Sequence, residues 1–187
     1  MKTYVSFLRG VNMTGHNSIK MTDLKALYIK IGLNDAETFI QSGNVIFCKT
    51  GDITPEALSV NIEQAILEKF NYIVPAMIRT HQELRDLFSL NPYLKETGFN
   101  LSKMAVIFLH EEPSDTQLQK VENVDYPPDR FKIIGKEIFI YCPNGFGRTK
   151  LYTNFFEKKM GVTGTARNWK TITTISDTMH TKSKLHK

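Results

Sequence analysis

The stretch "VIFCKTGDITPEAL" (45–58) joins a short apolar run to a strong helix start. The run is rich in β-forming side chains, and Thr54-Pro55-Glu56 places a proline at the first helical position. A second stretch, "FIYCPNGFGRTKL" (139–151), has the same organisation and brings the cysteines and leucines of both stretches nearly into register. This similarity predicts that the chain contains one structural unit twice.

The elements around these two stretches are predicted to occur in the same order in both halves of the chain. Each half should contain a strand, a helix, a hairpin, a second helix, a last strand and a trailing helix. The predicted strands are residues 3–8, 37–41, 44–48 and 74–79 in the first half and 103–109, 130–134, 137–142 and 162–166 in the second.

This order predicts the α+β class, with an α/β plait built by tandem duplication of two ferredoxin-like βαββαβ units. Each unit should have an antiparallel sheet and a trailing helix. We expect the first ferredoxin-like subdomain, with its trailing helix, at residues 1–98. The second, with its trailing helix and a basic tail, is expected at 99–187.

Individual residues predict several turns and helix ends. Ser42-Gly43 and Gly135-Lys136 should each form a two-residue hairpin turn. Thr80 and Glu83 have the spacing of a capping box at a helix start. A helix predicted over 149–160 should end at Gly161.

Composition narrows the class of protein and its compartment. The chain of 187 residues is 41% hydrophobic and 23% charged, as is ordinary for a soluble globular protein. No apolar run approaches the roughly 20 residues that span a bilayer, so we expect no membrane partner. Arg9 and Gly10 come too early for a signal peptide, which predicts a cytoplasmic location. Cys48 and Cys142 lack CxxC spacing and the histidines lack metal-ligand spacing, so we expect free buried thiols, no metal and no cofactor.

Positive charge gathers in the C-terminal fifth of the chain. From Arg148 to Lys187 there are nine Lys/Arg and two Asp/Glu, a balance of +7, while the rest has 15 and 17, which gives the net +5. Such a basic patch predicts attraction of nucleic acid or of a phosphorylated small molecule. The alternative is that part of it is only a solvated tail.

The segment "NGFGRTK" (144–150) resembles a phosphate cradle, but it lacks the spacing of a Walker A loop. Backbone N–H groups at a helix start, with Gly147, Arg148 and Lys150 beside them, would favour an anion. The counterpart in the first half is acidic and capped by proline, so it needs no ligand. This difference predicts an anion site at 145–150, and a simple turn is the alternative.

The loop at residues 9–17 is long, polar and rich in glycine, so its backbone could surround a ligand. Arg9 could bind a carboxylate or phosphate through its planar guanidinium. The predicted ligand contacts in this loop are Arg9, Gly10, Asn12, Gly15 and Asn17. The alternative is an ordered connector in which the two asparagines bind their own backbone.

Two further segments complete the predicted site. Gln41 and Asn44 flank a hairpin corner and would offer polar contacts if that corner lines a cleft, although a plain turn explains them equally. The segment "ARNWK" (166–170) is predicted to begin the last helix, with Arg167 and Asn168 available to a ligand and Trp169 in the core. No residue has an evident catalytic partner, so the catalytic residues are unknown.

Five motifs in order are similar to a known family: "FLRGVNMTGHN" (7–17), "IQSGNVIF" (40–47), "NPY" (91–93), "GRTKL" (147–151) and "RNW" (167–169). The chain resembles the bacterial family of conserved proteins catalogued as domain of unknown function number 1697. The resemblance covers residues 3–178 and implies two tandem ferredoxin-like subdomains. It implies no activity.

The favoured hypothesis is an uncharacterised cytoplasmic protein that binds an anionic ligand, either a phosphorylated molecule or nucleic acid. The ligand would contact loops 9–17 and 145–150 and the start of the last helix. One alternative is a non-catalytic structural or interaction protein. Another is an enzyme of unknown reaction with a cleft between the two subdomains, so whether the chain is an enzyme stays open.

Overall fold

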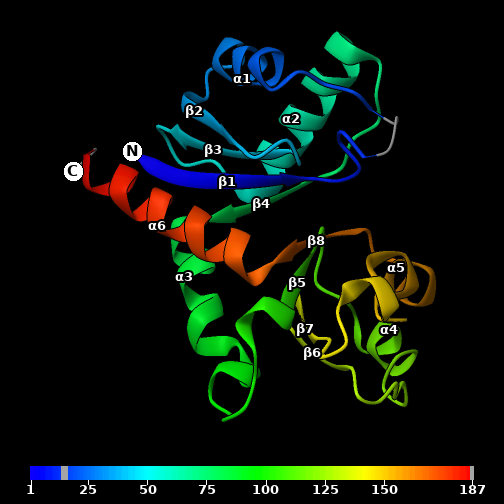
Figure 1. Cartoon of the computed structure of the whole chain (residues 1–187). Coiled ribbons are helices and arrows are strands. Elements are labelled where there is room, and N and C mark those ends of the chain that lie inside the picture. The colour runs from blue at the N-terminus through cyan, green and yellow to red at the C-terminus, as the bar shows by residue number, and fades with distance from the viewer. Residues whose placement is uncertain (14–16, 186–187) are drawn as a thin grey trace. The chain divides into compact units, whose positions relative to one another are not determined.

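The computed structural model describes residues 1–13 and 17–185, and these residues form six α-helices and eight β-strands. The strands make two four-stranded antiparallel sheets (Figure 1). The chain therefore has the α+β class that the sequence predicts. The predicted site residue Gly15 lies outside the described residues.

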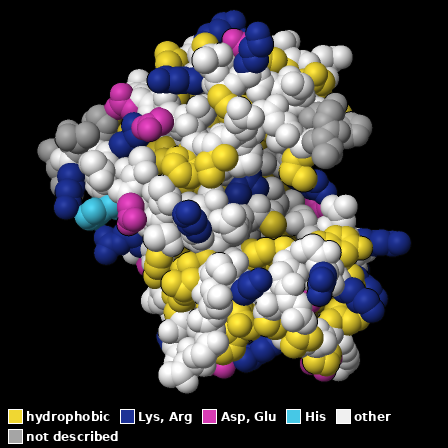
Figure 2. All heavy atoms as spheres, viewed as in Figure 1, with side chains coloured by type: hydrophobic (Ala, Val, Ile, Leu, Met, Phe, Trp, Pro, Cys, Tyr) yellow, Lys and Arg dark blue, Asp and Glu magenta, His cyan; other side chains and the backbone are white. Residues whose placement is uncertain are grey.

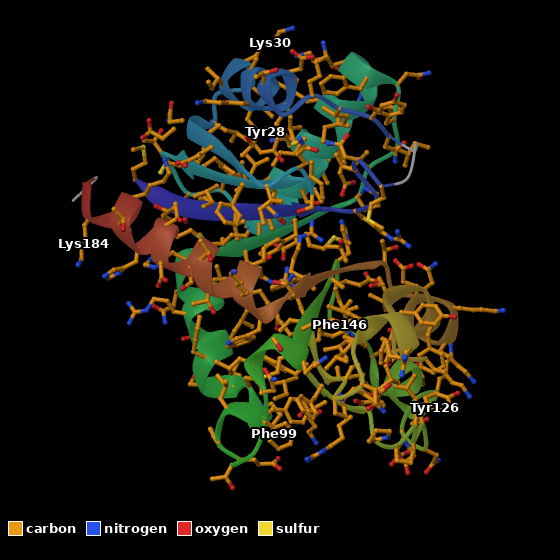
Figure 3. The ribbon with its side chains drawn as sticks, viewed as in Figure 1. Tyr28, Lys30, Phe99, Tyr126, Phe146 and Lys184 are labelled. Atoms are coloured by element: carbon orange, nitrogen blue, oxygen red, sulfur yellow. The ribbon has the colours of Figure 1, made fainter. Side chains whose placement is uncertain are left out.

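Sheet 1 contains β1 (Lys2–Leu8), β2 (Asn34–Phe39), β3 (Asn44–Lys49) and β4 (Ala76–Thr80), in the order β2-β3-β1-β4. Helices α1 (Met21–Lys30) and α2 (Pro55–Phe70) cover one face of this sheet, and α3 (His81–Leu90) follows β4 (Figure 1). Tyr28 points from α1 toward the sheet (Figure 3), where its hydroxyl shares a buried 2.7 Å hydrogen bond with Ser6.

Sheet 2 contains β5 (Met104–Leu109), β6 (Arg130–Ile134), β7 (Glu137–Tyr141) and β8 (Gly164–Asn168), in the order β6-β7-β5-β8. Residues of α5 (Thr153–Met160) and residues that follow α4 (Asp115–Gln119) pack in one apolar core against one face of the sheet. The last helix is α6 (Trp169–Leu185). The two sheets thus have the same strand order and the same sequence of elements.

Alternation along the strands builds one apolar core beside each sheet. In sheet 1, Tyr4 and Phe47 point to the face that α1 and α2 cover, and in sheet 2 Ile107 and Ile140 point toward α5. Each fully buried side chain of this kind stabilises the fold by about 1.5–3 kcal/mol. The opposite face of the central strands is buried as well, since Val5 and Val106 are both inaccessible to solvent.

By its internal contacts the chain divides into two compact units. Unit 1 comprises Met1–Arg85 and Thr174–Lys187, and unit 2 comprises Asp86–Thr173. Helices α3 and α6 are therefore each divided between the units. The subdomain boundary expected after residue 98 concerns the sequence repeat, and it stays a prediction.

Several predicted turns and helix ends are confirmed. The Thr80 amide donates to Glu83 (2.7 Å) and the Glu83 amide donates to Thr80 Oγ1 (3.1 Å), so the capping box forms. Gly161 ends α5 in the left-handed conformation, with a φ of 76°. Gly135 begins the two-residue turn between β6 and β7, with a φ of 58°.

Three predictions of local structure are wrong. Helix α5 begins at Thr153, not at residue 149, and the last helix begins at Trp169, so Arg167 and Asn168 lie in β8. The first hairpin turns over residues 40–43, with Ile40 and Gly43 both at positive φ, rather than over two residues.

Candidate functional site

The segment 144–150 forms a compact turn between β7 and α5. The Gly145 amide donates to Cys142 O (2.9 Å), and the Arg148 amide donates back to Gly145 O (3.2 Å). The Leu151 amide donates to Thr149 Oγ1 (2.9 Å). These three N–H groups are satisfied within the turn, and the helix starts only at Thr153. The segment therefore does not lie at the start of α5, and an anion site at its backbone N–H groups stays a prediction.

The side chains of this turn nevertheless line a cavity. Arg148, Lys150 and Asn144 contribute to a pocket of about 270 Å³ in unit 2, whose other wall is the segment 125–129. We call it the Arg148 pocket. Its lining residues are Asp125, Tyr126, Pro127, Pro128, Asp129, Asn144, Arg148 and Lys150. The structure thus brings two of the predicted cations to one cavity.

The charge of the Arg148 pocket is mixed. The ammonium of Lys150 lies 5.1 Å from the centroid of the Tyr126 ring, within the range of a cation–π interaction. Tyr126, labelled in Figure 3, packs edge-on against Phe155 with 5.8 Å between ring centroids. Asp125 and Asp129 line the same cavity, so its lining contains two acidic and two basic residues. Such a pocket suits a ligand that carries both an anionic group and hydrogen-bond donors.

Cys142 lies buried beside this pocket as a free thiol, as the sequence predicts. Burial raises the pKa of the Cys142 thiol, a hydrogen bond with Thr149 lowers it, and the Asp129 carboxylate raises it. The net shift is upward, so the group stays a protonated thiol at neutral pH. A nucleophilic cysteine needs the opposite shift.

In unit 1, the Asn12 side chain contacts Ile19 and the hairpin corner at Gln41. Its side-chain amide donates to Ile19 O (2.9 Å) and to Gln41 O (3.1 Å), and its oxygen accepts from the Ile19 amide (2.9 Å). The backbone N–H of Asn12 donates to the backbone O of Asn17 (3.2 Å), and both asparagines have positive φ. These bonds agree with the connector interpretation, and ligand contact by this loop stays a prediction.

Three further predicted residues of unit 1 have local structural roles. Asn44 is 0% exposed and donates to Phe39 O (3.0 Å) and Ser42 Oγ (2.9 Å), which fixes the hairpin corner. Arg9 is half-buried, and its amide donates to Pro75 O (2.9 Å). Gly10 adopts a φ of 69°, which favours glycine. Asn12 and Gln41 also line one surface cavity of about 530 Å³ with residues 18–22.

Arg167 and Asn168 do not join the Arg148 pocket. Arg167 is 9% exposed and donates to Thr165 Oγ1 and Ala166 O, both at 2.7 Å, and burial lowers its pKa to about 10. Asn168 caps α6, because its side-chain oxygen accepts from the Thr171 amide at 2.8 Å. Gly147 lies in the turn, but it is not among the residues that line the pocket.

A second buried arginine, Arg79, is not among the residues predicted from the sequence. Arg79 is 3% exposed and donates to Ile78 O at 2.9 Å. It faces Val5 across β4 and β1, just as Arg167 faces Val106 across β8 and β5. The two arginines therefore occupy equivalent positions in the two sheets. Aligning the last strand of each predicted unit would have revealed the correspondence.

Two classes of feature are absent from the part of the chain that the structure describes. Among residues 1–13 and 17–185, no three His, Cys, Asp or Glu side chains gather where they could hold a metal ion. Over the same residues, no helix has both the length and the apolar character to cross a membrane.

Comparison with known proteins bears on the family and the fold. A family model described as "Protein of unknown function (DUF1697)" matches residues 1–139. Among solved structures, the conserved bacterial protein SP0830 from Streptococcus pneumoniae matches with a TM-score of 0.75 at 20% sequence identity, over 95% of this chain and 98% of that chain. At this identity the likeness concerns the fold alone. No curated protein matches the chain.

Proposed function

We propose, from the premise that the chain belongs to the DUF1697 family of proteins of unknown function, that unit 2 binds a small phosphorylated molecule in the Arg148 pocket. The observation that carries this proposal is the meeting of Arg148 and Lys150 with Tyr126 and two carboxylates in one cavity. The guanidinium and the ammonium would bind the phosphate, since both are preferred phosphate ligands in proteins.

The two carboxylates narrow the class of ligand. Asp125 and Asp129 can accept hydrogen bonds from hydroxyl or amino groups on the part of the ligand that is remote from the phosphate. A sugar phosphate or a nucleoside monophosphate carries both kinds of group. The cavity of about 270 Å³ lies just below the range of small-molecule sites, which begins at roughly 300 Å³.

Nucleic acid is a weaker candidate for this pocket. Carboxylates next to the cations would repel the neighbouring phosphates of a polyanion. Lys182, one of the C-terminal cations, forms an ion pair with Glu37 at 3.0 Å. On the face that Figure 2 shows, Lys and Arg side chains are scattered among other types and form no single continuous patch.

The same proposal includes the origin and the compartment of the protein. The repeated strand order and the equivalent arginines Arg79 and Arg167 support a tandem duplication of two ferredoxin-like units, with the repeat boundary after residue 98. The two free buried cysteines support a reducing compartment, which in most cells is the cytoplasm.

Titration of the isotope-labelled protein tests the function. Inorganic phosphate and adenosine monophosphate are added, and backbone amide shifts are followed by NMR. We expect the largest shifts at residues 125–129 and 144–150, and a loss of affinity of about tenfold or more when Arg148 and Lys150 are both replaced by alanine.

The matched control replaces Lys158 and Lys159 by alanine. These lysines are exposed on α5, outside the pocket, so this variant loses the same formal charge. Equal affinity losses in the two variants would mean that only net charge matters, and would exclude the proposed site. A further titration with single-stranded DNA tests whether nucleic acid is the ligand instead. Tight binding whose affinity falls steeply with salt would identify nucleic acid, not a small molecule, as the ligand.

A further inference from the structure

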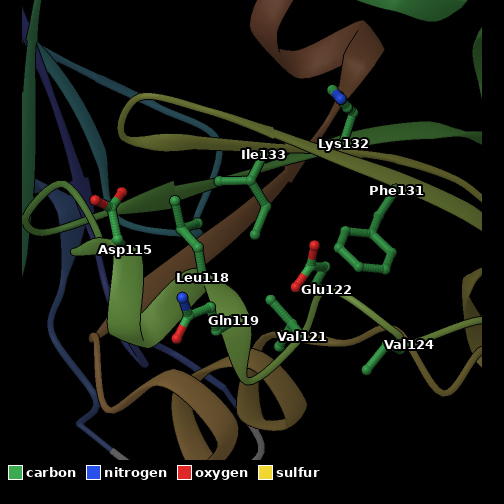
Figure 4. A pocket seen from close by; sticks show the side chains of 9 residues that line it. All are labelled: Asp115, Leu118, Gln119, Val121, Glu122, Val124, Phe131, Lys132 and Ile133. Carbon is green, nitrogen blue, oxygen red and sulfur yellow. The ribbon is translucent and has the colours of Figure 1, made fainter.

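A second and larger pocket in unit 2 lies between α4 and the edge strand β6. Its volume is about 610 Å³, within the range of small-molecule sites (Figure 4). Apolar side chains form its floor: Leu118, Val121, Val124, Phe131 and Ile133. We call it the α4–β6 pocket.

The hollow exists because α4 is short. Helix α1, its counterpart beside sheet 1, has ten residues and buries Leu24, Leu27 and Tyr28, whereas α4 has five and buries none of its own. In β2, the strand that corresponds to β6, Ala36 is 2% exposed. Phe131 and Ile133 of β6 are only partly buried. Unit 2 thus leaves apolar surface accessible where unit 1 covers it.

Of the three charged residues that line the pocket, two are acidic and one, Lys132, is basic. Asp115 and Glu122 line the pocket, and neither carboxylate forms a hydrogen bond or an ion pair within residues 1–13 and 17–185. In Figure 4, Leu118 and Ile133 point toward each other, Glu122 lies beside Phe131, and Lys132 points away from them. Lys132 follows the alternation of the strand, so its ammonium does not neutralise the rim.

We propose that the α4–β6 pocket binds a small amphipathic cation, with an aromatic or aliphatic body on the apolar floor and an ammonium group at the rim, where Asp115 and Glu122 lie. Apolar burial supplies the attraction, and the carboxylates select the charge. This site is separate from the Arg148 pocket and selects the opposite charge. The two proposals can therefore succeed or fail independently.

The test compares three probes of similar shape and different charge: 2-phenylethylammonium, 2-phenylethanol and 3-phenylpropanoate. Amide and methyl shifts of the labelled protein give the affinity of each. We expect the cation to bind best, with shifts at Leu118, Phe131 and Ile133. The double variant Asp115→Asn, Glu122→Gln should weaken binding of the cation about three- to tenfold and leave binding of the alcohol unchanged.

The control variant Asp125→Asn, Asp129→Asn removes two carboxylates from the Arg148 pocket and should leave the affinity for 2-phenylethylammonium unchanged. All these substitutions preserve shape, so the fold should survive, and circular dichroism checks this. The proposal is overturned if the alcohol binds as well as the cation, or if the Asp115 and Glu122 variant keeps full affinity. It is equally overturned if no probe shifts the floor residues at millimolar concentration.

Discussion

Gly43 has a φ of +69°, and a Cβ built on it would lie 2.9 Å from Leu8 Cβ and 3.2 Å from Val11 Cβ. Gly43→Ala therefore combines backbone strain with overpacking of the hairpin corner. We expect the free energy of unfolding to fall by about 2–4 kcal/mol, as measured by urea denaturation.

Gly51→Ala is the matched control for this substitution. Gly51 has a φ of +86°, and among the described residues no heavy atom beyond its two chain neighbours lies within 4 Å of the added Cβ. It should lose only the backbone part, about 1–2 kcal/mol. Equal losses in the two variants would show that Leu8 and Val11 do not restrict the corner.

His81 makes stability depend on pH. Its Nε2 is buried and has no hydrogen-bond partner among the described residues, and its ring lies 5.8 Å from that of His180. Burial lowers the pKa of His81, and the charges of Arg85 and His180 lower it further. The His81 imidazole is therefore protonated at a higher pH in the unfolded chain than in the folded protein.

It follows that the contribution of His81 is fully present above about pH 7 and is lost as the pH falls through the unfolded value of about 6.5. Urea unfolding between pH 5 and 7.5 measures it. In His81→Phe, the stability difference between pH 7.5 and pH 5 should shrink. An unchanged difference would assign the effect to other groups.

Arg130, the first residue of β6, joins that strand to the segment after α3. Its guanidinium lies 5.3 Å from the Tyr93 ring centroid and 5.2 Å from that of Phe99, and it contacts both Glu96 oxygens at 3.1 and 3.2 Å. Both charged side chains are about half exposed, so solvent weakens the ion pair.

Arg130→Lys keeps the charge but loses the planar stacking and the two-point contact. We expect it to cost about 0.5–1 kcal/mol in urea unfolding. Glu96→Gln removes only the ion pair and should cost less. A larger loss in Glu96→Gln than in Arg130→Lys would assign the stability to charge rather than to the rings.

Most strands were predictable from sequence because their apolar runs are short, and several of them end at glycine turns such as Gly43 and Gly135. The start of α5 was not, because Thr149 has the character of a helix cap. Instead its hydroxyl accepts from Leu151, and a short turn forms before the helix. A threonine can either cap a helix or accept a hydrogen bond within a turn. The surrounding structure determines which of the two forms, and the local sequence pattern does not show it.

Only part of the lining of the Arg148 pocket was predicted from the sequence. Its cations were named, but Tyr126 and the two aspartates were not. The hairpin explains their position: β6 and β7 pair Arg130 with Tyr141, so the residues before Arg130 and after Tyr141 must meet. The predicted turn at Gly135 already implied this pairing. The α4–β6 pocket had no such signal, because it results from the short length of α4.

At the scale of the whole molecule, the chain carries one thiol in each compact unit. Cys48 belongs to unit 1 and Cys142 to unit 2, and both are 0% exposed. We expect each thiol to react with a water-soluble disulfide reagent at least about 10³-fold more slowly than in the unfolded chain. Mass spectrometry of the peptides assigns the rates, and rapid reaction in native buffer would contradict the burial.

Because the cysteines lie in different units, the labelling rate of each thiol reports the opening of its own unit. Each thiol reacts only when its own unit opens, so the two labelling rates time two openings in one sample without any added probe. Gly43→Ala should increase the labelling rate of Cys48, which lies in the strand that follows Gly43. Whether Cys142 quickens with it measures how far a disturbance in one unit is felt in the other.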